Sequence, residues 1–324
     1  MANVICKMLG IQYPIFQGAM GSVGKRKIAG PLLVSAVSNA GGLGILPTWG
    51  RSSEDLRQEI RKTRELTDKP FAVNIVPLGR EFFTNRAHVV IEEGISIVTT
   101  GRGDPEAKNV QELKSKGITV IPVVPTVALA KRLEREGADA VIASGAEAGG
   151  HVGEVATMPL IPQVVDAVKL PVIAAGGIGD ARGIAASLAL GACGVQLGTL
   201  FLATKEVGLS PLSHQVLIKS GDEDTAVTRA LTGKPVRVVT GPEGKKLIRN
   251  EKTASEDELK HIYAEVSKLA KTESKGQIIP GGQVTGLIHD VLSTKELIHK
   301  LVLETGELLR RLSSQAQDWE EKGV

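Results

Sequence analysis

The sequence predicts an α/β protein, a (β/α)8 TIM barrel with a small, mostly helical second domain. Short apolar segments rich in Val and Ile recur along the first two-thirds of the 324 residues. Most of them do not alternate with polar residues, which is typical of strands buried on both faces of a parallel sheet. Stretches with helical spacing separate them, so each strand is expected to form a βα unit with the helix that follows. Eight such units between residues 1 and 206 are the number that closes a TIM barrel.

Eight segments are predicted to be the barrel strands. In chain order they are Pro14–Gln17, Leu43–Leu46, Phe71–Val76, Ser96–Thr100, Thr119–Val124, Asp139–Ala143, Pro171–Ala175 and Gly194–Leu197. An open, doubly wound sheet is the alternative arrangement. That fold commonly carries a Gly-x-Gly-x-x-Gly turn after an early strand, and the glycines after the first strand here lack this spacing.

Helices are predicted between the strands from their caps and apolar spacing. Ser52–Thr67 begins at a Ser that suits a helix N-cap, and its polar composition indicates a surface helix. Val127–Glu136 and Ile161–Val168 carry apolar residues three and four positions apart. These segments are expected to cover the outside of the barrel.

The pattern changes after Glu206, which predicts a smaller, mostly helical domain over residues 207–289. It contains a helix at Glu256–Lys271 and a glycine-rich loop at Gly276–Gly286. In the last thirty or so residues, Leu, Ile and Val recur at helical spacing among charged residues. We therefore expect a C-terminal helix within residues 290–324 that packs back on the barrel and completes it.

Composition and charge exclude several classes of protein. A net charge of +3 and only 3% aromatic residues argue against a nucleic-acid partner. Cys6 and Cys193 cannot form a disulfide framework, and no cluster of His and carboxylates has the spacing of a metal site. The apolar runs are shorter than a membrane span, and no signal peptide is seen. A cytoplasmic protein without a membrane or metal partner is expected.

Glycines follow the last two predicted strands, where TIM barrels commonly bind phosphate. Gly176 and Gly177 follow the seventh strand, and Gly198 and Thr199 follow the eighth. Because glycine has no side chain, a phosphate could approach the main-chain N–H groups at the start of the next helix. Thr199 would add an exposed N–H group and a hydroxyl donor. Two ordinary strand-to-helix turns are the alternative.

Two further polar residues are candidates for chemistry. His151 ends a glycine-rich loop, and an imidazole over the barrel mouth would serve as a base or proton donor near neutral pH. Asn74 interrupts a buried apolar strand and needs a polar partner, which a ligand's amide edge would supply. The alternatives are a plain loop histidine and a hydrogen bond from Asn74 to a neighbouring strand's loop.

Several motifs occur in an order that resembles the FMN enzymes comprising nitronate monooxygenases (2-nitropropane dioxygenases) and flavin-type enoyl-ACP reductases (FabK). They are Tyr13–Met20, Ala40–Gly44, Asn74, Glu147–His151, Ala174–Gly177 and Gln196–Thr199. The resemblance implies FMN across the barrel mouth and a catalytic role for His151. The FMN-binding positions that it implies are Gly18, Met20, Gly21, Asn74, Gly149, Gly150, Gly176, Gly177, Gln196, Gly198 and Thr199.

The two branches of this resemblance predict different reactions. Thr99–Gly103 and Ile121–Lys131 look more like the enoyl reductases. However, the reductases commonly have Glu at Ser144 and Arg at Leu200, and Thr228–Arg237 is similar to the nitronate branch. We therefore expect a nitronate monooxygenase that uses O₂. The alternative is an NAD(P)H-dependent enoyl-ACP reductase acting on an acyl carrier protein thioester. A homodimer is compatible with either branch. The alternative to an enzyme is a protein that stores flavin or uses it for regulation.

Overall fold

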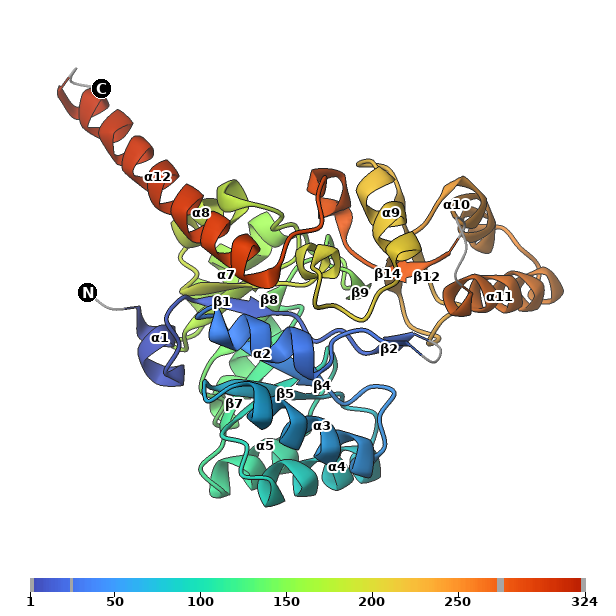
Figure 1. Ribbon diagram of the computed structural model, residues 1–324, viewed down its shortest axis with the longest axis horizontal. Helices are drawn as coiled ribbons and strands as arrows, with labels where there is room; N and C mark the ends of the chain where they lie inside the picture. Colours follow the sequence, from blue (N-terminus) through green and yellow to red (C-terminus); the bar gives the residue numbers. More distant parts are fainter. Residues whose placement is uncertain (1–2, 24–25, 273–276, 322–324) are drawn as a thin grey trace.

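In the computed structural model, which describes residues 3–23, 26–272 and 277–321, eight parallel strands form one sheet (Figure 1). The strands lie in the order β1-β11-β10-β8-β7-β6-β5-β4. Their bounds are β1 Ile15–Gln17, β4 Gly44–Pro47, β5 Phe71–Ile75, β6 Ile97–Thr100, β7 Thr119–Val124, β8 Val141–Ser144, β10 Val172–Ala175 and β11 Gly194–Leu197. A bridge between Phe16 and Leu43 joins the two edge strands. The N–H of Gln17 donates to the Leu43 carbonyl at 2.9 Å, so the sheet closes into the predicted barrel.

The barrel is filled by side chains and covered at the end where its strands begin. Phe16, Ile45, Ile142 and other inward residues form one apolar cluster that also contains residues of helix α1 (Val4–Leu9). The Asn3 side chain accepts the first free N–H groups of α1 and donates to the Cys193 carbonyl at 2.6 Å. Because α1 is fixed at this end, ligands have access from the end where the strands finish.

Helices cover the outside of the barrel. They are α2 Pro31–Asn39, α3 Ser53–Leu66, α4 Arg80–Glu92, α5 Ala107–Ser115, α6 Val127–Arg135, α7 Thr157–Ala167, α8 Ala181–Ala189 and α12 Thr294–Glu321. Ser52 caps α3 as predicted, in a capping box with Asp55. Packing is tight, because a Cβ atom on Gly44 of β4 would clash with the carbonyl oxygen of Val34 in α2.

Helix α7 differs from the prediction, because it begins at Thr157 rather than at Ile161. Pro159 lies in the first turn of α7, where main-chain N–H groups have no hydrogen-bond partner within the helix. Proline has no N–H group, so it costs the helix no hydrogen bond at this position. The Glu147 carboxylate accepts the N–H of Thr157 at 2.9 Å and caps the helix from within the loop that connects β8 to α7. The prolines obscured the helix start in the sequence.

The described residues of the segment 207–289 form three α-helices around a small antiparallel sheet, beside the barrel (Figure 1). The helices are α9 Pro211–Lys219, α10 Pro242–Arg249 and α11 Glu256–Lys271, the last with the predicted bounds. The sheet pairs β12 Thr225–Thr228, β13 Val236–Val239 and β14 Ile279–Pro280 with β9 Gly150–His151 from a barrel loop. The sequence did not indicate this sheet, and the division at residue 207 stays a prediction. Gly276, the start of the predicted glycine-rich loop, lies outside the described residues.

Short elements complete the described chain. They are β2 Ser22–Val23, β3 Arg26–Lys27, and the 3-10 helices η1 Thr199–Ala203, η2 Asn250–Lys252 and η3 Gln283–Leu287.

The C-terminal helix α12 only partly follows its prediction. Leu297, Ile298 and Leu301 in its first turns are buried, and this part packs on α8 and α2 (Figure 1). Leu309 and Leu312 were expected to pack back on the body but are 39% and 46% exposed. The helix extends beyond the barrel, and residues 309–317 are all exposed. Residues 322–324 lie outside the described part. Among the described helices, none is both long enough and apolar enough to span a membrane.

Candidate active site

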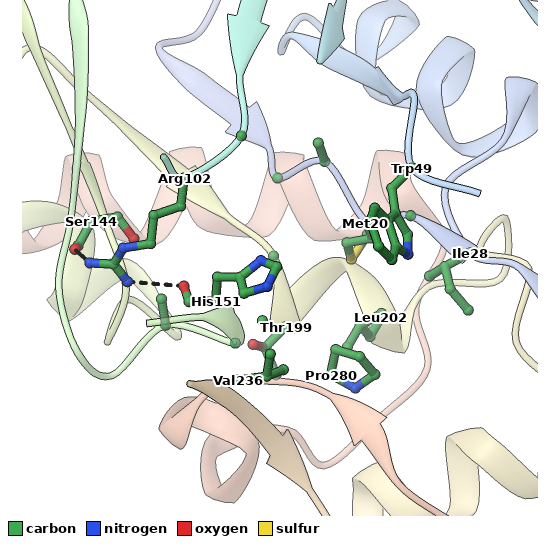
Figure 2. Close-up of a pocket in the computed structure, with 18 of the residues that line it drawn as sticks. Met20, Ile28, Trp49, Arg102, Ser144, His151, Thr199, Leu202, Val236 and Pro280 are labelled. Atoms are coloured by element: carbon green, nitrogen blue, oxygen red, sulfur yellow. Dashed lines mark hydrogen bonds between the residues drawn. The ribbon is translucent and has the colours of Figure 1, made fainter. Parts of the chain in front are cut away.

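The residues predicted to bind the cofactor or to act in catalysis line one cavity of about 460 Å³. It lies where the barrel strands end and is covered by residues of the small sheet (Figure 2). The predicted residues in its wall are Gly18, Met20, Gly21, Asn74, Gly149, Gly150, His151, Gly176, Gly177, Gln196, Gly198 and Thr199. The fold thus brings every predicted position to one site, although their roles stay predictions.

Free main-chain N–H groups gather in the wall after strands β10 and β11. The N–H groups of Gly177, Ile178, Gly198 and Thr199 have no hydrogen-bond partner among the described residues. Gly176 and Gly177 have φ angles of 91° and 69°, in the left-handed region that favours glycine. Unpaired N–H groups grouped in such turns form a binding site for an anion, and one phosphate would satisfy several of them. We call these four residues the amide cradle.

The amide cradle differs in detail from the predicted phosphate site. The prediction used the N–H groups at the start of the next helix. The Asp180 side chain instead accepts those of Arg182 and Gly183, at 2.8 and 3.4 Å, and so caps α8 itself. Thr199 is also buried rather than exposed, and its hydroxyl accepts the N–H of Gly282 at 2.8 Å. After β10 the free donors therefore lie in the turn before α8, whereas after β11 the free N–H of Thr199 lies at the start of the 3-10 helix η1 (Thr199–Ala203).

His151 lies on strand β9, which pairs with strand β13 of the small sheet. Figure 2 shows its imidazole pointing into the cavity. Nε2 is 2.8 Å from the hydroxyl oxygen of Thr232, and no described residue bonds Nδ1. Burial is the main cause that lowers the pKa of His151, and the positive charges of Lys234 and Arg102 lower it further. The imidazole is therefore neutral at pH 7 and able to accept a proton.

Arg102, in the loop after β6, holds the main chain around His151. Its Nη1 donates to the His151 carbonyl at 3.0 Å, and its Nη2 donates to the Ser144 carbonyl at 3.3 Å (Figure 2). Burial lowers the pKa of the guanidinium to about 10, so it remains charged at neutral pH. Sequence reasoning gave no role to Arg102 or to Thr232. A basic residue two positions after a buried strand could have indicated Arg102, whereas no local pattern indicated Thr232.

Asn74 has the neighbouring-strand partner that was the alternative to a ligand. Its side-chain N–H donates to the Thr99 hydroxyl at 2.9 Å, across the paired strands β5 and β6. Its amide oxygen accepts no hydrogen bond from the described residues, and the side chain also lines the cavity. Asn74 therefore keeps an acceptor for a ligand while Thr99 fixes its orientation.

The other side of the cavity is apolar. Figure 2 shows Met20, Ile28, Trp49, Leu202 and Pro280 on the side away from Arg102. A Cβ atom on Gly21 would lie 2.7 Å from Cδ1 of Trp49, so glycine is what allows the indole to lie against this loop. The cavity thus combines unpaired N–H groups, a neutral imidazole and an apolar wall, which suits a planar phosphorylated cofactor and an organic substrate. The described residues contain no group of His, Cys and carboxylates able to hold a metal ion.

Comparison with known proteins shows what this chain is similar to. A family model described as nitronate monooxygenase matches residues 2–82 and 76–304. A "probable nitronate monooxygenase" of Staphylococcus saprophyticus is 38% identical over 275 residues, covering 71% of this chain and 76% of that protein. A Rhodococcus jostii "(3aS,4S,5R,7aS)-5-hydroxy-7a-methyl-1-oxo-octahydro-1H-indene-4-carboxyl-CoA dehydrogenase" is 42% identical over 238 residues, or 73% of this chain and 65% of that protein. The structure of FabK from Thermotoga maritima matches with a TM-score of 0.87 and 38% identity, over 97% of this chain and 99% of that one.

Proposed function

This chain belongs to the nitronate monooxygenase family, and from that premise we propose that it binds FMN and oxidises alkyl nitronates with O₂. The family and the FabK neighbour are flavin-dependent oxidoreductases, and so is this protein. One observation carries the proposal further. The amide cradle and the neutral imidazole of His151 line the same cavity.

The described residues fit FMN. The amide cradle would hold its single phosphate, since the N–H groups of Gly177, Ile178, Gly198 and Thr199 otherwise lack partners. The sequence resemblance assigns Met20, Gly21 and Asn74 to the ring system. When bound, FMN would supply the redox chemistry, by which electrons from the organic substrate reach O₂.

His151 is proposed to handle the proton of the substrate. A nitroalkane loses the proton on its nitro-bearing carbon to become a nitronate, and a neutral imidazole is able to accept it. Thr232 holds Nε2 at 2.8 Å, which leaves Nδ1 for another partner. When the substrate is supplied as the nitronate, no proton need be removed, and His151 would orient the anion instead.

Reduction of an enoyl-ACP thioester is the second candidate, and the likeness to FabK over 97% of the chain favours it. In this reaction NAD(P)H would supply the electrons. His151 would donate a hydrogen bond to the thioester carbonyl as negative charge develops on its oxygen. Acyl carrier protein would then be a partner. The homodimer and the cytoplasmic location remain predictions for either reaction.

Anaerobic mixing of the purified flavin-loaded protein with single substrates tests these proposals. Propyl-2-nitronate should bleach the visible absorbance of the oxidised flavin, and O₂ should restore it. Bleaching by NADH or NADPH but not by the nitronate, with recovery on adding an enoyl thioester, would establish the second candidate. A protein that takes up no FMN at all would overturn both.

A further inference from the structure

Arg102 carries a half-buried positive charge that no carboxylate compensates among the described residues. Its two hydrogen bonds go to main-chain carbonyl oxygens, those of His151 and Ser144. Burying an unpaired charge costs free energy, and folded proteins retain such groups mainly where they serve a function. We propose that Arg102 positions His151 for catalysis, by joining the main chain of His151 to the end of strand β8 through its charged guanidinium.

The guanidinium reaches from the loop after β6 past β7 to the end of β8 and to β9, in the loop that follows β8. Arg102 follows β6, Ser144 ends β8, and His151 forms half of the two-residue strand β9. A Cβ atom on Gly153 would clash with Nη2 of Arg102, so glycine at this position makes room for the planar group. A guanidinium donates several N–H groups in one fixed plane, which lets a single side chain join two carbonyls that lie on different segments.

His151 is held from two sides by this arrangement. On the side of the small sheet, β13 pairs with β9, and the Thr232 hydroxyl lies 2.8 Å from Nε2. On the barrel side, Arg102 is the side chain that bonds the main chain of His151. A strand as short as β9 has few hydrogen bonds of its own, so losing Arg102 should let residues 144–153 move relative to the barrel.

The charge of Arg102 has a separate effect on the His151 side chain. Both Arg102 and Lys234 lower the pKa of His151, and burial lowers it more than either charge. These are the charged groups that act on the imidazole, one from the barrel and one from the small domain. Lys234 makes no side-chain hydrogen bond among the described residues, so it supplies charge without holding the main chain. It is therefore the matched control.

Three variants of the flavin-loaded protein separate the two effects. Arg102→Met removes the charge and both hydrogen bonds, Arg102→Lys keeps the charge but not the planar pair of donors, and Lys234→Met removes only a charge. Hydrogen exchange of residues 144–153 and a histidine-selective NMR titration supply readouts that do not depend on turnover. Thermal unfolding checks that each variant is folded.

We expect faster exchange over residues 144–153 in both Arg102 variants and wild-type exchange in Lys234→Met. The pKa of His151 should rise in Arg102→Met and Lys234→Met and stay unchanged in Arg102→Lys. Displacing a catalytic group by about 1 Å can cost about 10²-fold in rate, so kcat should fall on that scale in both Arg102 variants. In Lys234→Met, kcat at its optimal pH should stay close to that of the wild type.

The proposal rests on the proposed role of His151, and the two can fail separately. If Arg102→Lys shows the same hydrogen exchange over residues 144–153 and the same kcat as the wild type, the positioning role is overturned. A positive charge at residue 102 would then be enough to support turnover. If His151→Ala retains full turnover, the catalytic role of His151 fails, whereas the exchange data still report whether Arg102 holds the segment.

Discussion

A carboxylate at Gly198 should abolish tight FMN binding without harming the fold. Gly198 lines the cavity and has a φ angle of −105°, which residues other than glycine adopt without strain. A Cβ atom there would meet no other atom within 4 Å. Gly198→Asp is therefore sterically tolerated, and its carboxylate would stand beside the free N–H groups of Gly198 and Thr199.

Electrostatic repulsion sets the size of the expected effect. With the phosphate on these N–H groups, roughly 5 Å would separate it from the new carboxylate, and at an effective dielectric constant of about 20 the repulsion is about 3–5 kcal/mol. This corresponds to a loss of roughly two to four orders of magnitude in FMN affinity. Loss of the anion site itself adds to this, because the carboxylate competes for the same donors.

Gly198→Asn is the matched control, since it has nearly the same shape and no charge. Titrating each apoprotein with FMN and following flavin fluorescence gives the dissociation constants, and thermal unfolding of the apoproteins shows whether the fold is intact. The Asp variant should bind far more weakly than the Asn variant at equal stability. Equal affinities in the two variants would refute the placement of the phosphate on the amide cradle.

Three further predictions concern the base, its pH dependence and the barrel packing. His151→Ala should lose about 10²–10⁴-fold in turnover of a neutral nitroalkane while keeping FMN, and much of the loss should vanish with the preformed nitronate; equal losses would exclude a base. Because the pKa of His151 is lowered from 6.5, activity that needs the neutral imidazole should persist below pH 6.5 and fall only as the pH drops through the lowered value; a pH–rate profile with its midpoint above 6.5 would contradict this. Gly44→Ala should lower the free energy of unfolding in urea by about 1–3 kcal/mol, because the new methyl group meets the Val34 carbonyl, whereas Gly30→Ala, which meets nothing within 4 Å, should change it little.

The barrel could be predicted from sequence because its strands are buried on both faces. Such strands are continuous apolar runs that end at Gly, Pro or a polar residue, so Thr119–Val124 has the same bounds in prediction and structure. Strands β12 and β13 lack this signal. Thr225–Thr228 is only partly buried along most of its length, and Val236–Val239 carries Arg237 in its middle. Short strands with a polar face are hard to tell from loops by composition alone.

The same contrast holds within the site. The glycines and His151 lie in loops that follow barrel strands, so their positions in sequence already place them at the mouth. Arg102 and Thr232 matter through contacts with His151 across 49 and 81 residues of sequence, which no local pattern encodes. The capping of α8 by Asp180 likewise becomes visible only when side-chain hydrogen bonds are seen.

The proposed phosphate site and the proposed base depend on different parts of the chain. Most of the amide cradle lies in turns of the barrel, and its link to the small domain is the hydrogen bond from Gly282 to Thr199. His151, in contrast, lies on a strand whose pairing partner β13 and side-chain partner Thr232 both belong to residues 207–289. Changes in the packing of the small sheet should therefore alter the orientation of the imidazole before they alter the phosphate site. Because the proposed base lies on the sheet that covers the mouth, we expect turnover to depend on that sheet being in position.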